Sequence, residues 1–424
     1  MVSRGRSDIA IFVRLGGLRL QNIQTFFIPW LLVLLFTIAS VAIPDGNLSL
    51  SIFLLLLTHV ILIAYLNPEI KIIALILLLN TLLIFFLSVN DVSFSYLYTD
   101  GHRKVYINVI FLETIFWLFF GLGSFISKSK NMIFYDSNLS NALFFLASCL
   151  AVIELYFLYK GGLSNYIENP SKGTVLFELS CALLSLGAYL KERINIYWLL
   201  VAAILIIIGM LYGKRLPIAY LMMFFYILMY RKYGLNIAFL TVLITFLTAF
   251  LFGIFRDTGS VQLFLNELNM SALEKTNQGA IVHASSEYLN IISNGIITAP
   301  ERLMSFFGNF FGALFVSMSS MPDYVRINQF TLKHSMIQGN GGLIGVYSYF
   351  FLGFFGPVLL GYIFGVLVNY RRGVLGLIAM FLVITSPRWT MYNIGPVIRM
   401  LGVVLLVYIV MKLVRLQQNK VRVK

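Results

Sequence analysis

Long, uninterrupted apolar runs dominate this chain and leave few folds open to it. Blocks of roughly 15–25 apolar residues follow one another, separated by short charged segments, as at 26–44 and 70–90. A run of about 20 apolar residues is long enough to cross about 30 Å of hydrocarbon as a helix. Spanning strands are disfavoured because the runs are continuous rather than alternating. The sequence therefore predicts an all-α integral membrane protein.

The composition agrees with a membrane protein and argues against a nucleic-acid partner. Of the 424 residues, 59% are hydrophobic and 11% are charged, whereas a soluble domain carries about 25% charged residues. The formal net charge of +14 is explained by basic residues that flank the spans. Cys149 and Cys181 fall within apolar runs, so we expect packing residues there and neither a disulfide nor a metal site.

About twelve spans are expected, in a single polytopic domain that covers residues 1–424. Two of these spans, 216–230 and 374–386, are short, which indicates either entry of water into the protein or misjudged boundaries. The expected spans are 26–44, 48–66, 70–90, 107–126, 140–159, 173–190, 195–212, 216–230, 235–255, 342–368, 374–386 and 395–411.

The distribution of basic residues predicts the orientation of these spans. With the N-terminus in the cytoplasm, 18 of the 31 basic residues fall in cytoplasmic segments and eight in short segments on the other side. The other five lie in the 256–340 loop between the ninth and tenth spans, and long loops translocate largely regardless of charge. We therefore expect both termini in the cytoplasm and this large loop on the outer face.

The 256–340 loop is expected to contain short amphipathic helices, because its apolar residues recur at helical spacing. Helices of this kind lie against a membrane or over a cavity, and a loop this long more often covers a substrate than merely joins two spans. The recurring apolar residues are Leu263, Leu265, Leu268, Ile281, Tyr288, Ile292, Leu303, Phe306, Phe307, Phe310 and Leu314.

Three carboxylates, Glu113, Glu154 and Glu178, fall inside expected spans at a similar distance from their outer ends. An ionisable side chain costs about 2.5–3.5 kcal/mol near the centre of a span. The three carboxylates therefore indicate a polar cavity that opens outward, or else each is protonated or reaches the headgroups separately. His59, alone in the second span, is interpreted as a hydrogen-bonded packing residue.

Four arginines, Arg215, Arg256, Arg388 and Arg399, lie at the expected outer ends of spans. A cation in the first turn of a helix, as expected for Arg399, is disfavoured by a few tenths to about 1 kcal/mol unless an anion joins it. Guanidinium groups combined with helix N-termini form a phosphate site. The arginines thus predict an outward-facing anion site, with binding of lipid headgroups as the alternative.

Several common catalytic motifs are absent from the sequence. It contains no P-loop, no HExxH, no GxSxG and no paired aspartates for a metal-bound nucleotide sugar. We therefore expect no metal and no cofactor, and a glycosyl donor, if the chain uses one, would be linked to a lipid through phosphate.

The architecture resembles the Wzy-type O-antigen polymerases of Gram-negative inner membranes. The resemblance is carried by the G-K-R turn at 213–215, F-R-D-T-G at 255–259 and N-G-G-L-I-G-V-Y at 340–347, around the large loop. It implies a GT-C-like helical fold and a periplasmic loop in the inner membrane. It also implies transfer of a growing glycan from undecaprenyl diphosphate to a lipid-linked repeat unit, without a metal. The expected partners are the lipid-linked oligosaccharide, membrane lipid and a chain-length regulator protein.

In such a reaction, arginines would neutralise the diphosphate leaving group, and a carboxylate or histidine would deprotonate the acceptor hydroxyl. The candidate bases are His334, Glu287 and Asp257, although Asp257 could instead pair with Arg256, and Glu287 could face solvent. The rival functions are an O-antigen ligase of the same chemistry, a flippase for the lipid-linked oligosaccharide, and an acyltransferase, which the lack of a histidine–aspartate motif disfavours.

The predicted orientation can be tested by labelling single cysteines in intact cells. A cysteine near Asn277, in the large loop, is expected to react with an impermeant thiol reagent added outside, and one near Gly373 is not. The opposite labelling pattern would contradict the outward location of the loop.

Overall fold

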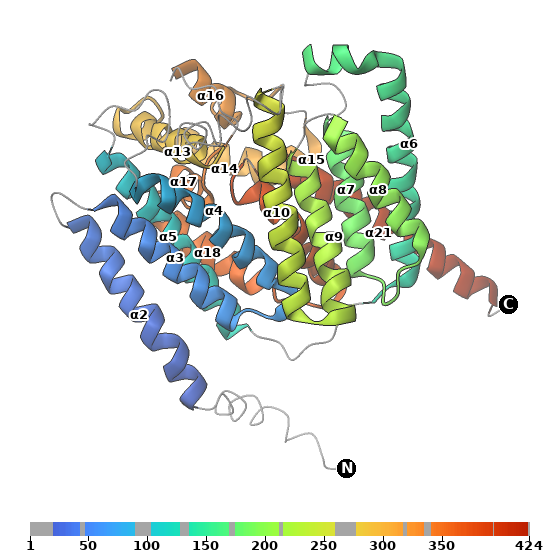
Figure 1. The fold of residues 1–424 in the computed structure, drawn as a ribbon, viewed down its shortest axis with the longest axis horizontal. Helices are drawn as coiled ribbons and strands as arrows, with labels where there is room; N and C mark the ends of the chain where they lie inside the picture. The colour runs from blue at the N-terminus through green and yellow to red at the C-terminus, as the bar shows by residue number, and fades with distance from the viewer. Residues whose placement is uncertain are drawn as a thin grey trace.

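A computed structural model describes most of the chain, namely residues 20–42, 47–89, 103–127, 135–168, 174–211, 215–258, 277–316, 320–334, 341–392 and 394–422. These residues are almost entirely helical, and the strand-like pairing among them is an isolated bridge between Gly341 and Tyr392. The predicted helical class is confirmed. Figure 1 shows the helices packed side by side as one bundle.

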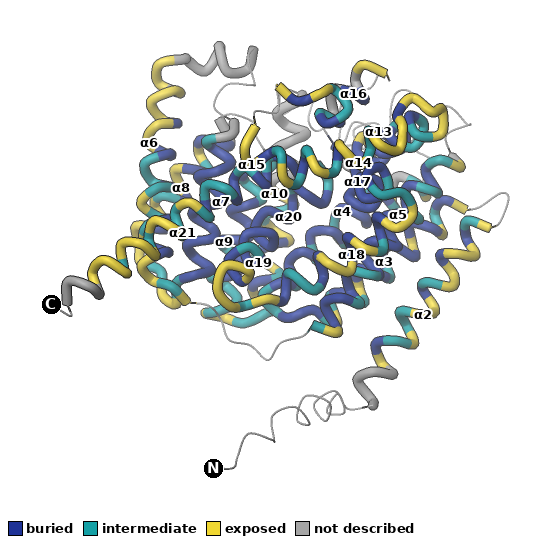
Figure 2. The backbone as a smooth tube through the Cα atoms, turned by 180° about the vertical axis from the view of Figure 1, so that it is seen from behind, coloured by how far each residue is buried: buried dark blue, intermediate teal, exposed yellow. Residues whose placement is uncertain are grey.

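Within the described part of the chain, six helices are long and apolar enough to cross a membrane, and each matches a predicted span. They are α2 (Leu20–Ala42), α3 (Leu48–Tyr65), α4 (Lys71–Val89), α5 (Arg103–Ile126), α6 (Ser137–Glu168) and α21 (Gly395–Arg422). Within the apolar part of each helix, 78% of the residues are buried in α5 but only 22% in α2. Helix α5 is therefore central and α2 peripheral, as the colours of Figure 2 also show.

Six further helices among the described residues fill the rest of the bundle. They are α7 (Thr174–Tyr189), α8 (Ile196–Leu211), α9 (Arg215–Tyr233), α10 (Leu235–Thr258), α18 (Phe355–Leu367) and α19 (Gly373–Ile384). The predicted short span at 216–230 lies within the 19 residues of α9, so its shortness came from misjudged boundaries. Helix α19 is short in the structure too, with 12 residues, and α20 (Ser386–Trp389) follows it directly.

The predicted single span at 342–368 is wrong, because the structure breaks it into α17 (Ile344–Leu352) and α18. Gly353 ends α17 with a φ of 62°, a conformation that a side chain disfavours. A Cβ at Gly356 would lie 1.8 Å from the carbonyl oxygen of Ser348, so the chain folds back tightly on itself here. Hydropathy does not register the break because the residues around it are all apolar.

Glycines let α17 and α18 approach α5 more closely than side chains would allow. A Cβ at Gly361 would lie 2.4 Å from the carbonyl oxygen of Phe116, and one at Gly365 would lie 2.0 Å from that of Phe120. Gly361 and Gly365 are four residues apart and share one face of α18, as in small-residue contacts between membrane helices. On α17, a Cβ at Gly345 would lie 2.5 Å from the carbonyl oxygen of Leu112.

The segment between α10 and α17 forms the short helices expected for the large loop. They are α13 (Asn277–Ser293), α14 (Ala299–Phe307), a π-helical stretch (Gly308–Gly312), α15 (Ala313–Phe315) and α16 (Ile327–His334). Figure 1 shows α13, α14 and α16 at the end of the bundle opposite the start of α2. The expected apolar residues Leu263, Leu265 and Leu268 lie outside the described residues.

The helices α13 and α14 are amphipathic in different ways. Ile281 and Tyr288 of α13 are buried against the bundle. On α14 and the stretch that follows, Leu303 and Phe307 remain exposed, and Phe315 is 86% exposed. The exposed apolar face is the kind that helices present to lipid at a membrane surface.

Polar contacts join the helix ends at the opposite end of the bundle. Asn369, after α18, accepts a hydrogen bond from Asn67 (2.8 Å) and donates to the carbonyl oxygen of Ser124 at the end of α5 (2.8 Å). Arg371 lies 3.7 Å from Glu69, in the turn between α3 and α4. The turns on either side of α5 are therefore tied together at this end.

A methyl group at Gly365 tests the glycine contact. We expect Gly365→Ala to destabilise the bundle by roughly 1–3 kcal/mol or more, because the added atom meets backbone rather than a movable side chain. Thermal unfolding in detergent measures the change. Gly402→Ala is the matched control, since its Cβ would meet the flexible end of Leu314 at 3.1 Å. Equal melting temperatures for the two variants would contradict the contact.

Candidate functional site

An ion pair between Arg388 and Glu178 is the centre of the candidate site. Arg388 lies in α20 and donates from Nη1 to Oε1 of Glu178, on α7, at 2.5 Å. The two side chains are only 20% and 7% exposed. The neighbouring Trp389 is fully buried and stacks on Trp117, about halfway along α5, with ring centroids 6.0 Å apart. The pair is therefore inside the bundle rather than on its surface.

Arg388 keeps hydrogen-bonding capacity that Glu178 does not use. Its Nε is buried and has no hydrogen-bond partner among the described residues. The hydroxyl of Tyr220, on α9, is buried and without a partner in the same part of the chain. Tyr220 lies close enough to Arg388 and Glu178 to interact with both charges. A guanidinium N–H and a phenol O–H are donors of the kind that bind an oxygen-rich ligand.

Further tyrosines surround this pair on the side of α13. Tyr347, on α17, interacts electrostatically with Arg388 and with Tyr392. Its hydroxyl lies 3.2 Å from that of Tyr288, on α13. Burial raises the pKa of Tyr288 above its ordinary value, so this hydroxyl keeps its proton and can act as a donor. The two tyrosines thus form a buried, hydrogen-bonded layer beside the ion pair.

Non-helical backbone lies beside the ion pair. The segments 341–344 and 390–392 run next to each other, with Gly342 N–H donating to the carbonyl oxygen of Met391 (2.9 Å) and Ile344 N–H to that of Thr390 (3.1 Å). Irregular backbone at membrane depth is tolerated where it is buried in protein or lines a cavity. This interruption of the helices is thus where a binding site is expected.

Glu113 takes a different role from Glu178. Its carboxylate accepts hydrogen bonds from Trp117 Nε1 (2.6 Å) and from Gly345 N–H (2.7 Å), in the first turn of α17. A carboxylate at a helix N-terminus is stabilised by unpaired N–H groups and by the helix dipole. Glu113 therefore fixes the start of α17 to the centre of α5.

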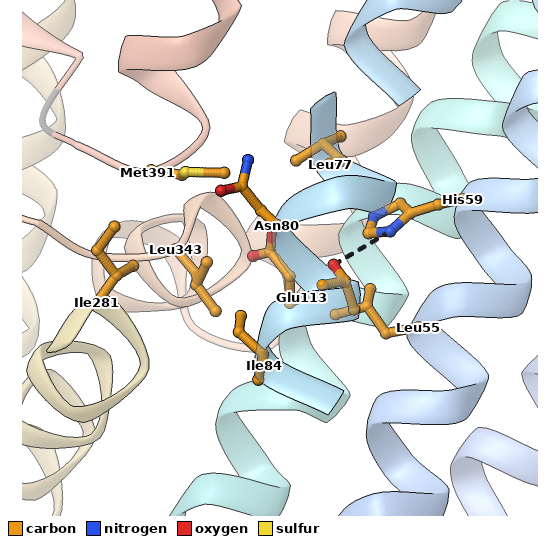
Figure 3. A pocket seen from close by; sticks show the side chains of 10 residues that line it. Leu55, His59, Leu77, Asn80, Ile84, Glu113, Ile281, Leu343 and Met391 are labelled. Atoms are coloured by element: carbon orange, nitrogen blue, oxygen red, sulfur yellow. Dashed lines mark hydrogen bonds between the residues drawn. The ribbon is translucent and has the colours of Figure 1, made fainter. Parts of the chain in front are cut away.

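Glu113 also lines a cavity of about 20 Å³, as Figure 3 shows. The other polar lining residues are His59, Asn80 and Thr81, and His59 Nδ1 lies 3.3 Å from Thr81 Oγ1. The apolar lining is Leu55, Leu77, Ile84, Ile281, Leu343 and Met391.

Glu154 and Glu178 are buried near Cys181, on which both act electrostatically. The three carboxylates predicted to share one cavity therefore fall into two groups, Glu113 beside His59 and the other two beside Cys181. The expectation that the cysteines are packing residues fits Cys181, which is free and buried.

The remaining predicted residues contact other partners, or their side chains are not described. Arg399, on α21, donates from Nη2 to the carbonyl oxygen of Val316 at 3.3 Å. Glu287, on α13, is half-buried and accepts a hydrogen bond from Asn290 (3.3 Å). His334 is exposed at the end of α16, with its ring 4.6 Å from that of Phe330.

Arg215, Arg256 and Asp257 lie in described helices, but their side chains are outside the description. Arg215 begins α9, and Arg256 and Asp257 are in the last turn of α10. Their predicted roles in diphosphate binding and proton transfer stay predictions.

Tyr220, Tyr288, Tyr347 and Tyr392 were not singled out as site residues in the sequence analysis. Nothing in their spacing connects them, because they come from α9, α13, α17 and the turn after α20. Of the four, Tyr347 alone had a signal in the sequence, since it belongs to the N-G-G-L-I-G-V-Y segment that carries the resemblance.

Comparisons of this chain with family models, curated proteins and solved structures gave no match. The function must therefore be argued from the site itself.

The Arg388–Glu178 pair predicts how single and double alanine variants differ in their stability to unfolding. Glu178→Ala and Arg388→Ala should each destabilise the protein by about 3–5 kcal/mol, because each leaves a buried charge without its partner. The double variant should be more stable than either single variant. Thermal unfolding of all four proteins in detergent measures the coupling, and strictly additive effects would contradict a direct pair.

Proposed function

We propose that this protein is a polymerase of lipid-linked glycans, an O-antigen polymerase of the Wzy type. It would join undecaprenyl-diphosphate-linked oligosaccharide repeat units at the periplasmic face of a bacterial inner membrane. The observation that supports this best is the buried Arg388–Glu178 pair, with free donors at Arg388 Nε and Tyr220, set among tyrosines. Guanidinium N–H groups suit a diphosphate, and phenols suit the attached sugars.

In the proposed reaction, an acceptor hydroxyl attacks the anomeric carbon of the donor glycan as the bond from that carbon to the diphosphate oxygen breaks. Arg388 would stabilise the negative charge that develops on the leaving diphosphate. Arg215, Arg256 and Arg399 are the other candidates for this role. His334, Glu287 and Asp257 stay the candidate bases, and no metal or cofactor is part of the proposal.

The arrangement of charges supports the proposed orientation. Lys71, Lys191 and Arg231 are among the 18 basic residues that the sequence analysis assigns to the cytoplasm. The start of α4 and the ends of α7 and α9, at or beside which they lie, are at the end of the bundle away from α13 (Figure 1). Arg231 donates to the carbonyl oxygens of Ala188 (3.0 Å) and Lys191 (2.6 Å), at the end of α7. By the positive-inside rule this end would face the cytoplasm, and α13 to α16 would lie in the periplasm. Twelve spans, cytoplasmic termini and a GT-C-like arrangement belong to the same proposal.

A flippase would need a path that opens alternately to both sides of the membrane. The contacts Asn67–Asn369 and Glu69–Arg371 join the turns at one end of the bundle, which favours a site that opens from the other side alone. An O-antigen ligase would use the same chemistry with another acceptor, so it stays the alternative that the glycan products must separate.

Removing Arg388 together with its partner Glu178 should abolish polymerisation and leave the protein folded. The double variant Glu178→Gln/Arg388→Gln removes both charges and keeps similar side-chain volume, so it should fold and leave single repeat units. Arg388→Lys should keep part of the chain length, because lysine retains the charge but not the planar fork. Arg215→Ala and Arg256→Ala are expected to leave very little long-chain glycan, whereas their lysine variants should keep part of the chain length.

The measurement is the length distribution of glycans formed from a lipid-linked repeat unit in vesicles, and in cells that lack the native protein. Arg193→Ala, at an exposed position between α7 and α8, is the matched control and should give normal chains. Normal chains from the folded double variant would refute the proposed site. Long lipid-linked chains that never reach the surface would indicate a ligase, and unpolymerised units that still face the cytoplasm would indicate a flippase.

A further inference from the structure

His59 lines the cavity beside Glu113 and has a buried ring nitrogen without a hydrogen-bond partner among the described residues. His59, on α3, is 1% exposed, and its Nε2 has no hydrogen-bond partner among the described residues. A buried polar group without a hydrogen bond costs about 1–3 kcal/mol. The other ring nitrogen lies 3.3 Å from Thr81 Oγ1, so Nε2 is the atom left over. Something other than the described side chains must satisfy it.

Glu113 lines the same cavity and keeps capacity to accept hydrogen bonds. One of its oxygens accepts from Trp117 and the other from Gly345, while a carboxylate offers about four acceptor sites. Trp117 joins the two polar residues, because its ring also contacts His59 edge-on, with centroids 6.1 Å apart. Asn80 adds a further polar neighbour, and its amide donates to the carbonyl oxygen of Ile76 (2.8 Å).

The volume of the cavity matches one small occupant. A water molecule needs roughly 10–15 Å³ of cavity and two to four polar partners, and this cavity offers about 20 Å³ with four polar residues. Water can donate to Glu113 and either donate to or accept from His59 Nε2, whichever tautomer the ring adopts. The described residues include no group of three or more histidines, cysteines or acidic residues that could hold a metal ion. Water is therefore the occupant that fits.

We propose that this cavity binds a single water molecule that bridges Glu113 and His59, so that the two side chains form one proton-sharing pair inside the bundle. The lining residues Leu343 and Met391 belong to the two paired segments beside Arg388. The Glu113–His59 cavity is therefore next to the candidate site. The water site does not depend on the proposed function, since it needs only the cavity and its polar side chains.

Solid-state NMR of ¹⁵N-histidine-labelled protein in lipid tests the site, because magnetisation can be transferred from water protons to a histidine nitrogen within hydrogen-bonding distance. The chain has four histidines, and the exposed His334 serves as the internal positive control. We expect rapid transfer from water to Nε2 of His59. Absence of transfer to His59, with a clear signal from His334, would overturn the proposal.

Two cavity variants and one control make the test specific. Leu55→Phe fills the cavity and should abolish the transfer to His59, whereas Leu50→Phe, on the exposed face of the same helix, should leave it unchanged. If Leu55→Phe does not fold, Asn80→Leu is used in its place, because it puts an apolar side chain of similar size at the cavity. Glu113→Gln should shift the Nε2 resonance of His59, since the bridging water loses its carboxyl partner. Transfer that survives in the folded cavity variant, or a resonance unmoved by Glu113→Gln, would contradict the bridge.

Discussion

The close approach of α17 and α18 to α5 is the contact on which the rest of the structure depends. Lipid tails are as apolar as leucine, so burial of apolar side chains gives membrane helices little reason to associate, and tight backbone packing takes its place. Gly345, Gly361 and Gly365 provide that packing here, each against a carbonyl oxygen or backbone of α5. Because Gly345 carries no side chain, its N–H can reach Glu113, and this hydrogen bond sets where α17 begins.

The position of α17 in turn determines the candidate site. A helix that begins inside the bundle leaves non-helical backbone before it, and buried backbone groups need partners. Residues 342–344 find them on 390–391, the segment that follows α20. Arg388 is therefore held inside the protein by a short helix that is itself stabilised through Trp389, whose Nε1 donates to the carbonyl oxygen of Leu382 (2.8 Å). The broken helices and the buried arginine are two results of one packing arrangement.

The sequence predicted the parts of this structure that depend on local pattern. The runs that became α2 to α6 and α21 were recognised because hydropathy and length are properties of neighbouring residues. The break at Gly353 was missed because apolar residues on both sides hide it. Arg388 and Glu178 were both selected, one for an anion site and one for a cavity, yet their pairing was not foreseen. They are 210 residues apart, and a single sequence contains nothing that reports a contact at that separation.

The charge balance at Arg388 limits what this residue can do alone. Glu178 neutralises it at 2.5 Å, so the pair as a whole offers a diphosphate little net positive charge. The pair can instead fix an orientation, because the hydrogen bond to Glu178 holds the guanidinium plane of Arg388 and leaves its Nε available. In the proposed reaction, net attraction for the diphosphate would have to come from other cations. The candidates are Arg399 near the start of α21, Arg215 at the start of α9 and Arg256 in the last turn of α10. In the proposed reaction this would divide the work, with Arg388 orienting the phosphate and the arginines at the helix ends supplying the charge that attracts it.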